Sequence, residues 1–166
     1  MSSELELVVG DAEYDDVMAI CRFGEAHVRS HYAPLIGVDA ADDQVRRWWN
    51  DAHIAAAAGK GLIVVAEVDG QVVGVGQRGR SGDNHVIYKL YVHPQHRGRG
   101  LGPQLLDALT KRLPPEAEKL YIEHFAANDR AGAFYEREGF TVERVEPSPT
   151  DDSALEIVWR VRDLVH

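Results

Sequence analysis

The spacing of apolar residues along the chain predicts a mixed sheet with helices packed on it. Runs that are typical of strands lie at residues 5–9, 62–68, 71–77, 85–92, 119–125, 140–145 and 154–161. Apolar residues recur at helical spacing within residues 12–28, 41–61, 101–113 and 128–138. This order predicts an α/β (α+β) fold with about seven strands and about four helices.

Turn and capping residues set the expected boundaries of these elements. Asp69-Gly70 separates two β-rich runs, which predicts a tight hairpin. Asp11 is expected to cap the first helix, and residues 31–37 are expected to form a loop. Asn128 is expected to begin the last helix and Gly139 to end it.

Length and composition predict one compact domain over residues 1–166. Apolar residues make up 45% of the chain and charged residues 27%, which is close to the globular average. The formal net charge of -9 argues against broad binding to nucleic acid or to an anionic membrane surface. We therefore expect neither nucleic acid nor membrane as a partner.

Cys21 is the only cysteine, so no disulfide can form within the chain. A zinc site would need histidine and carboxylate ligands, and we expect no metal. The sequence has neither a leader-like start nor an apolar run of the ~20 residues that span a membrane. These features favour a cytoplasmic protein.

One turn stands out because it collects positive charge in an acidic chain. Residues 92–106 read VHPQHRGRGLGPQLL, with three glycines between an apolar strand and an apolar helix. Glycines leave the main-chain N–H groups bare, and the first turn of a helix carries unpaired donors and the positive end of its dipole. The turn therefore predicts a site for a phosphate or pyrophosphate. The plainer alternative is an ordinary solvated turn whose arginines only keep the protein soluble.

The turn resembles the pyrophosphate loop of the GCN5-related N-acetyltransferase (GNAT) superfamily. That loop reads [QR]-x-x-G-x-[GA], and residues 95–100 read QHRGRG. A second motif of the family matches residues 128–140, NDRAGAFYEREGF. The resemblance implies the GNAT fold, with a mostly antiparallel sheet and two parallel strands that splay at the cofactor cleft. Acetyl-CoA is then the expected acyl donor.

The resemblance also implies which residues bind the donor and which act on it. The main-chain N–H of Val92, freed at a bulge, is expected to polarise the thioester carbonyl, and Tyr135 to protonate the departing sulfur. Phe134, beside Tyr135, is expected in the core. The expected cofactor-binding residues are Leu90, Tyr91, Val92, Gln95, Arg97, Gly98, Arg99, Gly100, Leu101, Gly102, Asn128 and Tyr135.

The base that deprotonates the acceptor is a separate question. Many members of the family carry a glutamate where this chain has Val86, so Glu123 on the strand 119–125 is the first candidate. His27, His31 and Tyr32 are expected to line the acceptor site, and any of them could replace Glu123. His96 is expected at the surface.

The favoured function is transfer of an acetyl group to a primary amine through a ternary complex. The acceptor is a small metabolite, an antibiotic or a peptide N-terminus, and the sequence does not choose among them. The alternative is a GNAT-fold module that binds acyl-CoA without turnover. The absence of a glutamate at position 86, which is Val86 here, favours this alternative. Members of the family often form dimers, which leaves a homodimer open.

Overall fold

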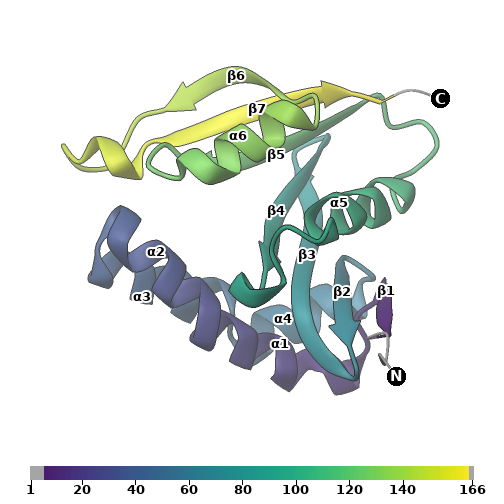
Figure 1. The fold of residues 1–166 in the computed structure, drawn as a ribbon. Helices are drawn as coiled ribbons and strands as arrows, with labels where there is room; N and C mark the ends of the chain where they lie inside the picture. Colours follow the sequence, from purple (N-terminus) through teal and green to yellow (C-terminus); the bar gives the residue numbers. More distant parts are fainter. Residues whose placement is uncertain (1–5, 165–166) are drawn as a thin grey trace.

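The computed structural model describes residues 6–164, and these form one seven-stranded mixed sheet flanked by helices (Figure 1). The strand order is β1-β2-β3-β4-β5-β7-β6. All neighbouring strands are antiparallel except β4 and β5, which are parallel. The strands are β1 (Leu7–Asp11), β2 (Ile63–Val68), β3 (Gln71–Ser81), β4 (Asn84–Val92), β5 (Lys119–Phe125), β6 (Thr141–Glu146) and β7 (Ile157–Asp163). The predicted fold class is confirmed.

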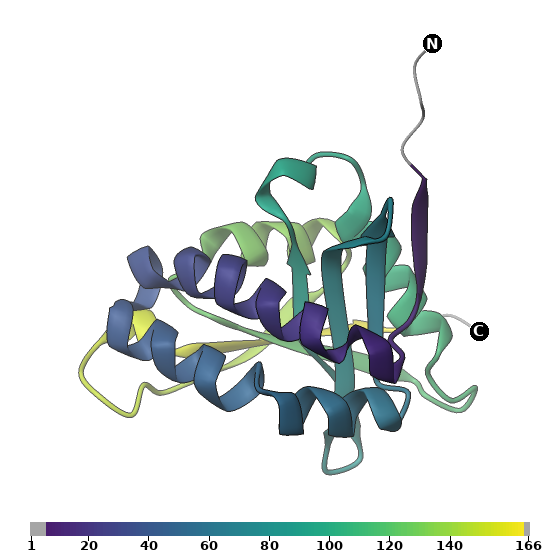
Figure 2. The same cartoon turned by 90° about the horizontal axis from the view of Figure 1, so that it is seen from below.

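The helices fall into two groups that cover opposite faces of the sheet. Seen from below, the first four lie together across the sheet (Figure 2). None of the helices within residues 6–164 is long and apolar enough to cross a membrane. The helices are α1 (Val17–Phe23), α2 (Arg29–Ile36), α3 (Val38–Trp48), α4 (Asp51–Gly59), α5 (Leu101–Lys111) and α6 (Asp129–Arg137).

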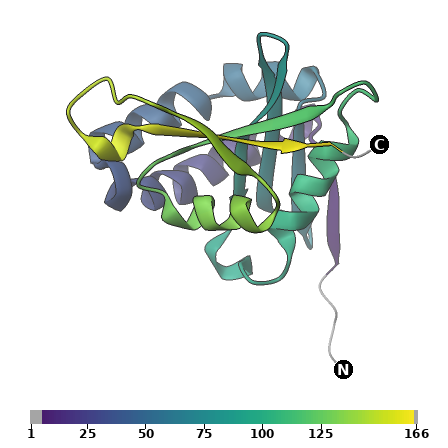
Figure 3. The same ribbon diagram turned by 90° about the horizontal axis from the view of Figure 1, so that it is seen from above.

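Alternation along the strands divides the apolar residues between two cores. On β2, Ile63 and Val65 face α1–α4, whereas Val64 and Ala66 face α5. Because successive side chains of a strand point to opposite faces, β2 contributes to both cores. Seen from above, β5, β7 and β6 run at a steep angle to the first strands and carry α6 (Figure 3).

The predicted loop at residues 31–37 is wrong, because these residues continue the first helix. A π-helical turn, Gly24–Val28, joins α1 to α2 without a break. Tyr32 and Ile36 on α2 are buried, so packing of this face favours helix over the predicted loop. Pro34 is accommodated in the last turn, and Gly37, with φ +90°, ends the helix.

Two further boundaries differ from the prediction. Asp11 is the last residue of β1 and does not cap a helix, and Glu13 forms a capping box with Asp16 instead. The predicted helix 41–61 is divided at Asn50, whose side chain accepts a hydrogen bond from the His53 N–H at 2.8 Å and so begins α4. Leu5, the start of the first predicted strand, lies outside the described residues.

Lys89 on β4 is a buried lysine that faces α1–α4. Its side chain is 4% exposed, and Nζ donates to Gln77 Oε1 at 2.7 Å and lies 3.3 Å from His53 Nε2. The ammonium also lies over the Trp49 ring, 5.3 Å from its centroid. Burial lowers the pKa of Lys89 to about 7, so folding favours the neutral amine.

We expect Lys89 to make stability depend on pH. Between about pH 7 and the ordinary lysine pKa of 10.5, the unfolded chain holds a proton on this amine that the folded chain has lost. The free energy of unfolding contributed by Lys89 therefore rises with pH across that window. Urea titrations should show this rise in the parent and in the exposed control Lys119→Met, but not in Lys89→Met. An equal rise in Lys89→Met would contradict the assignment.

Candidate active site

The site begins where the two parallel strands separate. β4 pairs with β5 only from His85 to Ile87, opposite Leu120 to Ile122, and the two strands then diverge (Figure 1). The rest of β4 toward Val92 stays paired with β3 on its other edge. The edge of β4 that faces β5 therefore leaves main-chain groups without a strand partner.

The amide of Val92 belongs to this open edge. His93 N–H donates to the Val73 carbonyl at 2.7 Å, on the β3 side. Successive N–H groups of a strand point to opposite edges, so the Val92 N–H points toward the gap beside β5. The family resemblance implies a bulge at Val92, but the register of β4 shifts at Tyr88, four residues earlier. The Val92 amide lies on the open edge because β4 and β5 separate before it.

A cleft of about 530 Å³ runs through the opening between β4 and β5. It is lined by Leu90 and Val92, which face α5 and α6, and also by Tyr91, which faces the opposite side of the sheet. The cleft therefore reaches from one face of the sheet to the other. Sequence-predicted residues that line it are His31, Leu90, Tyr91, Val92, Arg97, Gly98, Gly100, Leu101, Gly102, Asn128 and Tyr135.

The glycine turn forms one end of the cleft. Gly98 and Gly100 have φ values of +79° and +77°, a region that side chains other than glycine rarely adopt. Gly100 is the N-cap of α5, so the first N–H groups of that helix point into the turn. Together with Arg97, these donors suit an anion. Gln95 and Arg99 lie outside the lining, and Arg99 contacts His96 instead.

Tyr135 projects from α6 toward the opening between the strands. Asn128 caps this helix by accepting a hydrogen bond from the Ala131 N–H at 3.3 Å. The Tyr135 ring stacks on His124 with centroids 6.2 Å apart and packs edge-on against Phe140. Burial raises the pKa of its phenol well above the usual value, and the nearby Tyr32 raises it further. Tyr135 therefore keeps its proton at neutral pH and can donate it.

Three candidates named from the sequence lie outside the lining of the cleft. Glu123 is on the side of β5 that faces away from Tyr135, and burial followed by the charge of Glu146 raises its pKa, while Arg144 lowers it. The Tyr32 hydroxyl is hydrogen-bonded to the Tyr91 hydroxyl. His27 packs against His93, with ring centroids 4.2 Å apart.

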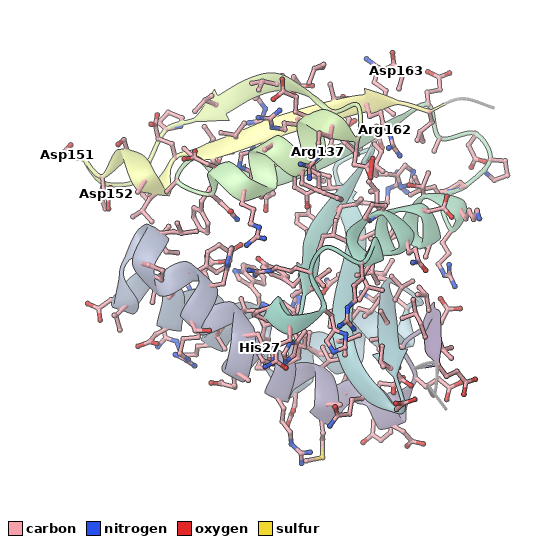
Figure 4. All side chains as sticks on the ribbon, in the orientation of Figure 1. His27, Arg137, Asp151, Asp152, Arg162 and Asp163 are labelled. Atoms are coloured by element: carbon pink, nitrogen blue, oxygen red, sulfur yellow. The ribbon has the colours of Figure 1, made fainter. Side chains whose placement is uncertain are left out.

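Sequence reasoning missed several residues of the cleft. Phe134, expected in the core, is half-buried and lines the cleft beside Gly102, and the expected surface residue His96 lines it as well. Arg130 and Arg137 also contribute from α6, where Figure 4 labels Arg137. The positions 130, 134 and 137 share one face of a helix, which is a signal that the sequence did contain. Residues 6–164 bring no three His, Cys, Asp or Glu side chains together as a metal site.

Solved structures of similar fold extend over nearly the whole chain. PaiA N-acetyltransferase from Thermoplasma acidophilum, in complex with coenzyme A, is 15% identical with a TM-score of 0.78, covering 96% of this chain and 99% of that one. YncA from Salmonella typhimurium, with its cofactor acetyl-CoA, is 22% identical with a TM-score of 0.68, covering 97% and 95%. The ribosomal-protein-S18-alanine N-acetyltransferase from Escherichia coli is 21% identical with a TM-score of 0.68, covering 97% and 96%.

A comparison with protein families agrees with the fold. Residues 59–142 match the family described as Acetyltransferase (GNAT) domain. The matched segment contains β4, α5 and α6, which supply most of the residues that line the cleft, and β5, from which β4 diverges. Because the match covers 84 of the 166 residues, this chain belongs to the GNAT acetyltransferase family.

Proposed function

We propose that this chain transfers an acetyl group from acetyl-CoA to a primary amine of a small metabolite, an antibiotic or a peptide N-terminus. The observation that carries the proposal is a cleft that joins an anion-binding turn on one face of the sheet to His31 and Tyr91 on the other. A donor bound in the turn can then present its thioester, through the opening between β4 and β5, to an acceptor on the far side.

Donor binding is assigned to the α5 and α6 side of the cleft. The pyrophosphate is placed against the main-chain N–H groups of Gly100 and the first turn of α5, with Arg97 and Arg130 supplying positive charge. The pantetheine arm would occupy the opening, where the free edge of β4 offers main-chain hydrogen bonds. Coenzyme A and acetyl-CoA in the similar structures support this assignment.

Two groups of the chain are assigned to the reaction itself. The Val92 N–H donates to the thioester oxygen as negative charge develops there, an interaction typically worth ~10²–10³ in rate. The amine nitrogen gives one proton to a base and bonds to the carbonyl carbon, the carbon–sulfur bond breaks, and the electron pair leaves with sulfur. Tyr135 gives its proton to that sulfur, which yields the free thiol. The phenol carries its proton at neutral pH, so the proton is available to the departing sulfur.

Thiol release from acetyl-CoA, measured over a panel of primary amines with mass spectrometry of the products, tests the proposal. We expect thiol release to require an amine. The amount of acetylated amine formed should equal the amount of thiol released. Tight binding of acetyl-CoA with no release for any amine would contradict transfer and favour the binding module instead.

A further inference from the structure

The continuous helix from α1 to α2 contains a π-helical turn, Gly24–Val28, just before α2 reaches the opening between β4 and β5. Its buried positions Ile20, Gly24, Val28, Tyr32 and Ile36 are four residues apart. In a regular α-helix each step of four residues rotates by about 40°, so such a row would drift off the core. The wide π turn, Gly24–Val28, offsets that drift, and Figure 2 shows the continuous helix along the sheet.

The π turn determines which side chains of α2 face the cleft. Gly24 packs directly under Trp49, because a Cβ on Gly24 would lie 2.7 Å from the indole ring. Farther along, Tyr32 covers the opening by contacting Tyr91 on β4 and Phe125 on β5. His31, the residue before Tyr32, is thereby turned toward the flank of the helix that lines the cleft.

The surroundings of His31 keep its imidazole neutral. Burial lowers its pKa below the usual 6.5, and the charges of Arg97 and Arg130 lower it further, while the Asn128 side chain acts in the opposite sense. The ring also lies near Tyr91, with centroids 6.4 Å apart. These groups come from β4, the glycine turn and the start of α6, and none of them carries a negative charge at neutral pH.

We propose that His31 is the general base that removes the proton from the attacking amine. This inference rests on the proposed acetyl transfer and assigns its missing step. An imidazole nitrogen of His31 takes the proton from the amine nitrogen as that nitrogen bonds to the thioester carbon. His31 comes from α2 and Tyr135 from α6, so base and acid enter the cleft from different helices.

Glu123 meets this need less well, although the sequence favours it. Its side chain shares the α1–α4 side of β5 with Phe125, and it does not line the cleft. Among the candidate bases Glu123, His27, His31 and Tyr32, only His31 lines the cleft together with Tyr135 and Val92. A base must come within hydrogen-bond reach of the proton it takes, directly or through one water.

The test compares His31→Gln with Glu123→Gln, using the acetyl-CoA assay and an amine that the parent accepts. His31→Gln should lower kcat by ~10²–10⁴ and keep its affinity for acetyl-CoA in calorimetry. The activity of the parent should fall when His31 becomes protonated, at a pH below the ordinary histidine pKa of 6.5. This acidic limb of the pH profile should be absent in His31→Gln. His85→Gln, at the far end of β4, is the matched control and should behave like the parent.

A second variant guards against a purely structural effect. Added imidazole should restore part of the turnover of His31→Ala, which a misfolded chain would not allow. Parent-like kcat and an intact acidic limb in His31→Gln would overturn the proposal, and so would loss of that limb in Glu123→Gln alone. A parent that acetylates no amine would overturn the proposed function and this step with it, whereas an active His31→Gln would overturn only this step.

Discussion

Gly100→Val is expected to weaken acetyl-CoA binding by about 5- to 140-fold. Gly100 has φ +77°, and a β-branched residue held there costs ~1–3 kcal/mol, which converts to this range at about 1.4 kcal/mol per tenfold. The turn can escape this strain only by changing the conformation that aims the first N–H groups of α5 at the ligand. Isothermal titration calorimetry with acetyl-CoA measures the loss.

Gly82→Val is the matched control for this experiment. Gly82, in the turn between β3 and β4, has φ +60° and, like Gly100, no heavy atom within 4 Å of an added Cβ. This variant should lose stability to backbone strain and still bind acetyl-CoA as the parent does, because Gly82 does not line the cleft. Parent-like affinity in Gly100→Val would show that the pyrophosphate does not bind at this turn.

Tyr135→Phe is expected to lower kcat by ~10²–10⁴ with little change in acetyl-CoA affinity. Phenylalanine keeps the packing against His124 and Phe140 and removes only the proton that sulfur would receive. A thioester with a more acidic thiol should recover part of the loss, since a weaker leaving base needs less help from an acid. Steady-state rates with both thioesters measure this.

Tyr88→Phe provides the matched control for Tyr135. Tyr88 is a half-buried phenol on β4 that donates to the Arg80 carbonyl at 3.3 Å and lies outside the cleft. Its replacement should leave kcat near that of the parent. If Tyr135→Phe folds and turns over as fast as the parent, its phenol is a packing group and the acid must be sought elsewhere.

Local sequence signals predicted the parts of the site that depend on local backbone geometry. The glycine turn could be read because Gly98 and Gly100 occupy positive φ, where other residues are strained. The start of α6 could be read because Asn128 has the side chain that caps a helix. Both features depend on a few neighbouring residues, so the sequence contains the information that fixes them.

The base could not be predicted in the same way because it depends on three-dimensional packing. Whether Glu123 reaches the cleft depends on which faces of β4 and β5 the opening joins, and no local pattern encodes that. The position of His31 depends on the π turn, Gly24–Val28, which packs against Trp49 in the break between α3 and α4. A regular helical pattern that ends before residues 31–37 leaves His31 on a loop.

The Val92 amide is an intermediate case. A free N–H at Val92 was predicted by resemblance, and its direction agrees with the hydrogen bond from His93 to Val73. The cause differs, because the bulge lies at Tyr88 and the open edge arises from the divergence of β4 from β5. Strand divergence involves elements separated by 26 residues in sequence, beyond the range of local propensity.

The most direct measurement is a crystal structure of the chain with coenzyme A. We predict the pyrophosphate within hydrogen-bond distance of the first N–H groups of α5, and the sulfur in the opening between β4 and β5 beside the Tyr135 hydroxyl. Coenzyme A bound away from the glycine turn, or with its sulfur remote from both Tyr135 and the Val92 amide, would contradict acetyl transfer at this site.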